Sequence, residues 1–195
     1  MTFVSPHSSK PAMNSHIHTF PVERELLVLD VETTGLRPDR NACIEIGALL
    51  LDRNLQINSS FSSLVCPWQG AEIVPEAMQK NRITPQELAA APPIQEVVKE
   101  FHAFAAVNPA PLIAGWNVWF DVGFLKDLYS RAALKWPFGH RLADVQSVFS
   151  YFSGFAGTSQ EEAIKQMLNE SQSHRALADA TQTTKILQKM AGVHP

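Results

Sequence analysis

The first strong hydrophobic pattern in the chain is a short apolar run that leads directly into acidic residues. Leu26–Leu29 are all apolar, and Asp30, Val31 and Glu32 follow without interruption. A short continuous run of this kind is typical of a strand buried on both faces of a sheet. Because side chains alternate along a strand, the carboxylates of Asp30 and Glu32 are expected on the same face. Gly35 predicts a tight turn where this strand ends.

Two further segments have the composition of strands, and the polar residues between them predict a reverse turn. The segments span residues 43–51 and 55–66, with Asp52-Arg53-Asn54 between them. Turn-forming residues between two such runs favour an antiparallel pair. A short apolar segment at 111–115 predicts one more strand.

Apolar residues at helical spacing predict helices along the rest of the chain. Residues 93–107 show this amphipathic spacing, and Thr84-Pro85-Gln86-Glu87 has the composition of a helix start. Asn117 is expected to cap a helix that runs to about Leu134. Further helical segments are expected at 75–88, 159–168, 175–190 and 144–152, the last of which is expected to bury Val145, Val148, Phe149 and Phe152. Strands followed by mixed helices and strands predict an α/β sheet packed by helices.

Length and composition fit one compact domain. The chain has 195 residues, of which 45% are hydrophobic, enough for a substantial core. No apolar run reaches the roughly 18 residues that a membrane span needs, and the first residues lack the features of a signal peptide. Cys43 and Cys66 form no CxxC pair, which fits a reducing cytoplasmic location without structural zinc. Residues 1–22 lack hydrophobic periodicity and are expected to form a disordered arm.

The charge of the chain limits the partners that it is expected to bind. The net charge is −3, which argues against broad, non-specific binding along a duplex, because such binding needs a basic face. An enzyme that holds a few phosphates through divalent metal ions remains compatible with this charge.

The paired acidic residues at the end of the first strand are the first candidates for chemistry. Two carboxylates on one face of a buried strand resist ionising together. A divalent cation between Asp30 and Glu32 would relieve this repulsion, and hard oxygen ligands suit Mg²⁺ or Mn²⁺. The alternative is a strand that simply ends in solvent with both carboxylates hydrated.

Two further motifs place polar residues beside predicted helix starts. Asn117 and Asp121 are four residues apart and lie on one helix face, directly after a strand. His174 is expected in the segment that leads into the last helix, with Asp179 one turn inside it. Each motif also has a simpler explanation: Asn117 as a cap, Asp121 as a charge favoured by the helix dipole, and His174 as a surface residue.

Taken together and in this order, the motifs resemble those of the DEDD-type 3′–5′ exonucleases, in the DnaQ-like branch that has a histidine as catalytic base. The three motifs are 30–35 (DVETTG), 117–121 (NVWFD) and 174–179 (HRALAD), and residues 73–84 also resemble a family segment. The resemblance covers about residues 25–191. It implies a ribonuclease H-like fold, a central mixed sheet flanked by helices, with residues 23–195 as the exonuclease domain.

The chain also departs from the family pattern at two positions. Trp116 stands where many relatives have a histidine, and Arg82 takes the place of a common glycine. The branch that uses tyrosine as base would have it four residues before Asp179, where this chain has Arg175. The resemblance is therefore to the histidine branch.

The resemblance implies a site with two divalent ions, Mg²⁺ or Mn²⁺. Asp30, Glu32 and Asp179 would hold one ion, and Asp30 would share the second, with Asp121 near it directly or through water. His174 would accept the proton of the attacking water. The substrate-binding residues implied by resemblance contact the terminal sugar or base, or lie beside them: Thr33, Thr34, Leu36, Asn117 and Phe120. For Leu36 and Phe120 the alternative is an ordinary place in the core.

The implied activity is metal-dependent 3′–5′ exonucleolytic hydrolysis of single-stranded DNA or RNA with a free 3′ end, which releases nucleoside 5′-monophosphates. The alternatives are a dedicated exoribonuclease and an inactive nucleic-acid-binding module of the same fold, although four intact carboxylates and His174 argue against the module. Neither the phosphate-binding GxxxxGK[ST] loop nor the GxSxG motif of serine hydrolases occurs. The chain ends soon after its last predicted helix, so a free-standing enzyme is expected rather than a polymerase-bound subunit. The sequence does not identify a protein partner, although one could dock elsewhere on the surface.

Overall fold

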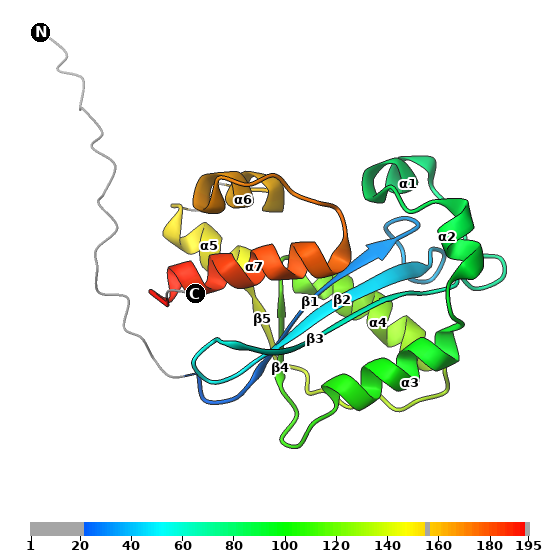
Figure 1. The fold of residues 1–195 in the computed structure, drawn as a ribbon, viewed down its shortest axis with the longest axis horizontal. Coiled ribbons are helices and arrows are strands. Elements are labelled where there is room, and N and C mark those ends of the chain that lie inside the picture. The colour runs from blue at the N-terminus through cyan, green and yellow to red at the C-terminus, as the bar shows by residue number, and fades with distance from the viewer. Residues whose placement is uncertain (1–21, 155–156, 194–195) are drawn as a thin grey trace, which may run out of the picture.

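The computed structural model describes residues 22–154 and 157–193, and its centre is a five-stranded mixed sheet with helices on both faces (Figure 1). The strand order is β3-β2-β1-β4-β5. β2 is antiparallel to both β1 and β3, whereas β1, β4 and β5 are parallel, as the resemblance implies. The strands are β1 (Leu26–Thr33), β2 (Cys43–Leu51), β3 (Ile57–Leu64), β4 (Leu112–Gly115) and β5 (Leu142–Asp144).

The helices cover the two faces of the sheet unequally. α3 and α4 pack against one face through Leu27, Leu29 and Val31 of β1, and α7 crosses the other face (Figure 1). α5 and α6 pack beside α7, while α1 and α2 lie at the end of the sheet where β1 finishes. The helices are α1 (Pro75–Asn81), α2 (Pro85–Ala90), α3 (Ile94–Ala105), α4 (Val118–Arg131), α5 (Val145–Phe152), α6 (Gln160–Leu168) and α7 (Ala176–Met190).

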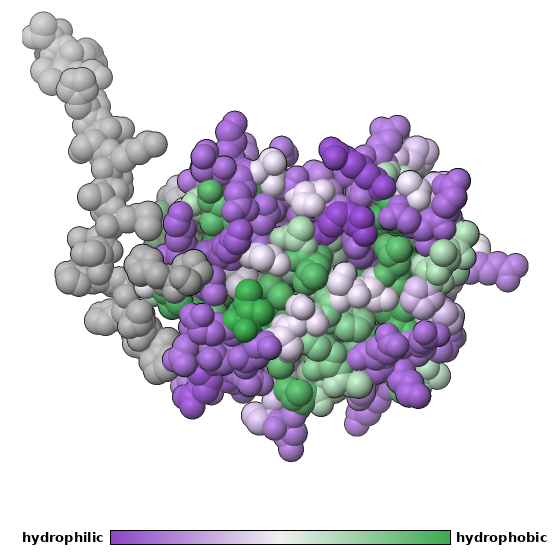
Figure 2. All heavy atoms as spheres, in the orientation of Figure 1, coloured by the Kyte–Doolittle hydropathy of each residue, from purple (hydrophilic) through white to green (hydrophobic). Residues whose placement is uncertain are grey.

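The outer surface of the sheet beyond α7 is left open. In the view of Figure 2, hydrophilic residues gather over α6 and α1, and paler and greener residues lie over the strands below α7. Ile57 of the edge strand β3 is 48% exposed there. Among the described residues, no helix is both long and apolar enough to cross a membrane.

Most predicted elements are confirmed within a few residues, and three details are wrong. β5 was not predicted, because three residues are too few to show a pattern. Val148 and Phe152 are 42% and 48% exposed, since α5 presents only the Val145–Phe149 stripe to its neighbours. The side chain of Asn117 makes no capping hydrogen bond; instead Asp144 Oδ1 accepts the N–H of Val118 at 3.3 Å.

Two local signals in the sequence have clear structural counterparts. Thr84 and Glu87 form a complete capping box at the start of α2. Arg82 ends α1 with φ of 58°, in the left-handed region, where a glycine would avoid the strain that a side chain brings. Of the predicted arm, only Val22 is described, and its N–H donates to the carbonyl of Arg53 at 3.2 Å; residues 1–21 lie outside the described part of the chain.

The contact between α7 and β2 is close enough to require a glycine. A Cβ atom at Gly47 would lie 2.0 Å from the backbone N of Leu177 and 2.2 Å from the carbonyl carbon of Ala176. Any side chain at this position would push the start of α7 away from the sheet. Gly47 therefore determines how near α7 comes to β1 and β2.

We expect Gly47→Ala to lower the free energy of unfolding by about 1–3 kcal/mol or more, because the added methyl group overpacks the contact between α7 and β2. Gly123→Ala on α4 is the matched control. Its Cβ would meet only Pro38 Cγ at 3.7 Å, so better helix propensity should stabilise the protein by up to about 1 kcal/mol. Urea denaturation of both variants measures the difference, and equal effects would contradict the close approach.

Candidate active site

Three carboxylates meet at the carboxyl end of β1, on the face that α7 covers. Strand alternation sends Leu27, Leu29 and Val31 toward α3 and α4, so that Asp30 and Glu32 point toward α7. Asp179, in the first turn of α7, approaches both of them. Each of the three side chains offers an oxygen within 4.8 Å of the others. The sequence prediction that these residues come together is confirmed as geometry.

Asp121 joins this group from the opposite side of the sheet. It lies in the first turn of α4 and is almost fully buried. Its Oδ1 accepts the backbone N–H of Val31 at 2.9 Å. This hydrogen bond holds the carboxylate of Asp121 against β1, at the residue that separates Asp30 from Glu32. Asp121 is also the charged neighbour that affects the pKa of Asp30 most strongly.

Burial raises the pKa values of all four acids, and repulsion by neighbouring carboxylates adds to this for Asp30, Glu32 and Asp121. Burial is the main cause for each of them. The pKa of Asp30 is also raised by the charges of Asp121 and Asp179, and the pKa of Glu32 rises to about 8. Without a cation, the group therefore retains protons near neutral pH. A compact set of oxygen ligands whose charges repel one another fits a hard divalent ion.

His174 lies beside the carboxylates, in the segment that leads into α7. Its backbone is left-handed, with φ of 55°. The preceding residues are attached to Asp179: Gln172 Nε2 donates to Oδ2 at 2.6 Å, and the N–H of Ser173 donates to Oδ1 at 3.2 Å. The location predicted for His174, before the helix, and for Asp179, one turn inside it, is confirmed as geometry.

A cavity of about 710 Å³ lies next to the carboxylates and His174. Its lining includes Asp30, Glu32, Asp121 and His174. Asp179 is not part of this lining, but it offers an oxygen within 4.8 Å of oxygens of Asp30 and Glu32. Of the residues predicted to bind substrate, those that line the cavity are Thr33, Leu36, Asn117 and Phe120.

Leu36, Phe120 and Thr34 differ in how they relate to the cavity. Leu36 is 81% exposed, which rules out the alternative of an ordinary core residue. Phe120 is half-buried and packs on Phe124 with ring centroids 5.0 Å apart, so it belongs to the core and to the cavity wall. Thr34 is fully buried: its N–H donates to the carbonyl of Ala42 and its carbonyl accepts the N–H of Val74. Its backbone is thus already paired within the protein.

Several cavity residues were missed by sequence reasoning. Arg37, Arg40 and Lys80 bring positive charge to the cavity, and Gln160 and Gln172 form its wall on the side of α6 and α7. Isolated basic and amide residues outside a motif carry no sequence signal of their own. Their grouping becomes visible only when β1, α1 and α6 are placed in space.

Comparison with known proteins agrees with this geometry. The family model described as "Exonuclease" matches residues 27–187. The chain belongs to the exonuclease family. DNA polymerase III subunit epsilon of Treponema pallidum is 32% identical over 169 residues, which cover 85% of this chain and 75% of that protein. Ribonuclease T of Yersinia enterocolitica is 30% identical over 182 residues, with 82% and 81% coverage.

The exonuclease fold is also found among solved structures. Exonuclease I of E. coli in complex with a dT13 oligonucleotide has a TM-score of 0.73 and 21% sequence identity. The match covers 85% of this chain but only 41% of that one, so it supports the fold alone. The expected ribonuclease H-like fold is confirmed, and so is the expected relationship to the exonuclease family that includes DNA polymerase III subunit epsilon and ribonuclease T. The protein is a nuclease.

The raised pKa values predict how stability of the metal-free nuclease depends on pH. Glu32 has a pKa of about 8 in the folded state against an ordinary value of 4.5, so the folded state binds this proton more tightly than the unfolded chain does. The stabilising effect of this proton is complete below about pH 4.5 and is lost as pH rises toward about 8. We expect the melting temperature in chelator to fall across this range. Mg²⁺ should restore it at the alkaline end, and thermal scans with and without Mg²⁺ test this.

Glu32→Gln is the control for this measurement. The variant lacks the titrating group, so its melting temperature in chelator should depend less on pH than that of the parent. A parent protein whose stability rises with pH in chelator would contradict the raised pKa values.

Proposed function

We propose that this nuclease is a metal-dependent 3′–5′ exonuclease that removes nucleoside 5′-monophosphates from single-stranded DNA or RNA. The observation that carries the proposal is the group of Asp30, Glu32 and Asp179, together with Asp121, at a cavity that His174 also lines. Four acids at one place, two of them buried and two half-buried, are unfavourable for folding alone, so a functional reason for them is needed.

The carboxylates are assigned as ligands of two divalent ions, Mg²⁺ or Mn²⁺. Asp30, Glu32 and Asp179 would hold one ion, and Asp30 would share the second with Asp121 nearby, because their oxygens are hard donors close together. When bound, two such ions assist the attacking water and stabilise the departing oxygen. The carboxylates themselves would fix the positions of the ions and supply the negative charge that holds them.

His174 is assigned as the general base. An imidazole has an ordinary pKa near neutrality and accepts a proton without prior ionisation. His174 lines the cavity beside the carboxylates, and its charge contributes to the pKa of Asp179. In this position it would take the proton from the water that attacks the terminal phosphodiester.

The cavity suits the end of a single strand. The exposed side chain of Leu36 and the ring of Phe120 offer apolar contacts to a terminal base that is no longer stacked on a partner. Lys80 adds positive charge that would attract the neighbouring phosphates in a protein of net charge −3. Arg37 and Arg40 also line the cavity, where they are paired with Asp39 and Glu72. Thr33 and Asn117 line the same cavity and are assigned to the terminal nucleotide. The oligonucleotide held by the structurally similar Exonuclease I supports this substrate class.

A dedicated exoribonuclease is the second candidate. The name of the relative ribonuclease T supports it, because the same phosphodiester chemistry acts on either sugar. An inactive binding module is less well supported, since such a protein would not need the buried carboxylates or His174.

Digestion of end-labelled oligonucleotides tests the proposed activity. With Mg²⁺ or Mn²⁺, a single strand labelled at its 5′ end should yield a ladder of shortened products, and one labelled at its 3′ end should release labelled mononucleotide at once. Matched DNA and RNA strands identify the preferred sugar, and a blunt duplex should be digested more slowly. Asp30→Asn is the inactive control. Activity that persists in chelator, or that begins at the 5′ end, would refute the proposal.

Substitution separates the metal ligands from the base. Asp30→Ala or Asp179→Ala should weaken Mg²⁺ binding and abolish turnover together, because both residues are assigned as ligands. His174→Ala should lower kcat by about 10²–10⁴-fold while leaving Mg²⁺ affinity close to that of the parent, since general-base catalysis contributes roughly this factor. Calorimetric Mg²⁺ binding and single-turnover digestion give the two readouts.

The pH dependence of the rate provides a check on His174. If His174 accepts the proton of the attacking water, the rate of the parent should rise with pH, and this rise should flatten in His174→Ala. A variant with near-parent turnover and an unchanged pH profile would show that His174 is not the base.

A further inference from the structure

A buried glutamate on β2 holds the start of α7 through hydrogen bonds to both oxygens of its carboxylate. Glu45 is only 4% exposed and lies directly opposite Glu32 in the pairing of β2 with β1. Arg175 donates to it from Nε, at 3.1 and 3.0 Å to the two oxygens, and from its second terminal nitrogen at 2.8 Å. The backbone N–H of Ala176 donates to Oε2 at 3.0 Å. Both oxygens of Glu45 therefore have partners within the protein, although the metal-ligand group is adjacent.

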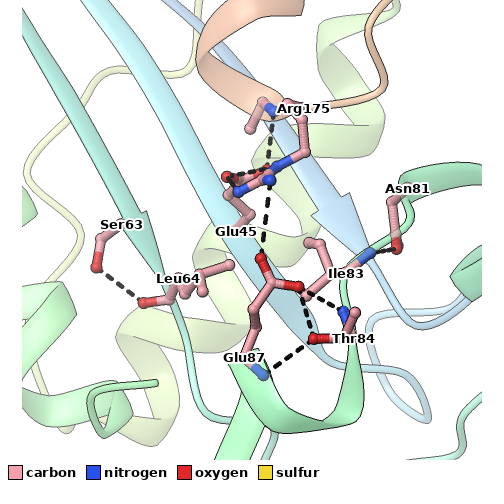
Figure 3. Close-up of polar contacts among 9 residues, drawn as sticks. Glu45, Ser63, Leu64, Asn81, Ile83, Thr84, Glu87 and Arg175 are labelled. Carbon is pink, nitrogen blue, oxygen red and sulfur yellow. Dashed lines mark hydrogen bonds and ion pairs between the residues drawn. The ribbon is translucent and has the colours of Figure 1, made fainter. Parts of the chain in front are cut away.

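Arg175 is the residue between His174 and the first turn of α7. Its planar guanidinium binds Glu45 in a fork, which restricts both distance and orientation. A second acid, Glu87 of α2, lies 3.9 Å from the other terminal nitrogen of Arg175 (Figure 3). The segment that carries His174 is thus attached to β2 by hydrogen bonds and to α2 by charge.

The backbone of His174 needs such support. Its φ of 55° is unfavourable for a residue with a side chain, and it persists only where the surroundings hold it. On one side, Gln172 and Ser173 are held by Asp179. On the other side, Arg175 and Ala176 are held by Glu45. His174 lies between two attachments, and release of either one allows its backbone to relax.

We propose that Glu45 is a positioning residue for His174, which acts through Arg175 and the N–H of Ala176 and touches neither substrate nor metal. The inference rests on the proposed role of His174 as the base. Loss of the Glu45–Arg175 fork would let the lead-in segment leave the left-handed conformation and move the imidazole from the carboxylates. Displacement of a catalytic group by about 1 Å can reduce a rate by about 10²-fold.

Glu45→Gln tests the proposal with little change of volume. Its amide keeps one acceptor for the N–H of Ala176 but loses the charge that binds the guanidinium. We expect kcat on a single-stranded oligonucleotide to fall by at least about 10-fold and by no more than it falls in His174→Ala, with KM within about twofold. Arg175→Lys retains the charge without the fork and should lie between the parent and Glu45→Gln. A variant that needs much more Mg²⁺ for activity would show that Glu45 acts on the metal ligands and would overturn the proposal.

Gln188→Leu is the matched control for a purely structural effect. Gln188 is 5% exposed, and at the other end of α7 its Nε2 donates to the carbonyl of Leu55 at 2.7 Å. Like Glu45→Gln, this variant removes a buried polar attachment between α7 and the sheet. Its melting temperature should fall while kcat at 25 °C stays near that of the parent. If both variants lose activity in proportion to lost stability, Glu45 has no positioning role.

A double-mutant cycle identifies the route of the effect. Once His174 is replaced by alanine, addition of Glu45→Gln should change kcat by less than about twofold, because the group that Glu45 positions is gone. Full additivity of the two substitutions would refute the proposal. If instead His174→Ala alone leaves turnover unchanged, the assigned base is wrong, which is a failure of the proposed function and not of the attachment.

A spectroscopic measurement tests the positioning without any activity. In protein with ¹⁵N-labelled histidine, the imidazole resonances of His174, assigned by their loss in His174→Ala, should shift in Glu45→Gln and stay in place in Gln188→Leu. Unshifted resonances of His174 in Glu45→Gln would overturn the proposal.

Discussion

The repulsion among buried carboxylates is the constraint on which the rest of this structure depends. Asp30, Glu32, Asp121 and Asp179 come from β1, α4 and α7, and burial raises the pKa of each one. Such a group assembles only if the surrounding elements are held together by other contacts. The apolar packing of β1 on both faces and the close approach of α7 at Gly47 supply them. The fold brings together charges that would separate in a less rigid scaffold.

Hydrogen bonds from the backbone keep these acids in place without neutralising them. The N–H of Val31 holds Asp121, and the N–H of Ser173 holds Asp179. Arg175 has a different role, because it is bound to Glu45 and not to the group assigned to metal. The positive charge of Arg175 is thereby paired with Glu45, and the acids assigned to metal remain available for a cation.

Much of the fold and the residues of the site could be predicted from the sequence, because their signals are local. The apolar run before Asp30 and the turn at 52–54 each report on neighbouring residues, and both are confirmed. The three motifs predicted which acids meet, since their order along the chain is that of a known family. Their roles in catalysis remain predictions.

The features that could not be predicted depend on contacts between distant segments. Asp144 caps α4 from a neighbouring strand, so the capping residue lies 26 positions from the N–H that it accepts. The exposure of Val148 depends on which neighbours α5 lacks, and the sequence of α5 does not contain that information. The sequence contains one indication of the role of Glu45, which is a single charged residue inside an otherwise apolar run. A buried charge requires a partner, so this position predicts a contact with a basic residue. That the partner is Arg175 follows only from the packing of α7.

The position of α7 also has a consequence for how the protein is made. α7 is the last described helix, and it contributes Asp179, follows His174 directly and covers the face of β1 that carries the other acids. During synthesis β1 and α4 emerge first, and a nascent chain that has not yet placed α7 holds an incomplete set of ligands. The carboxylate group is therefore complete only when α7 has docked against the sheet. The fold thus couples the assembly of the four acids to the docking of a single helix.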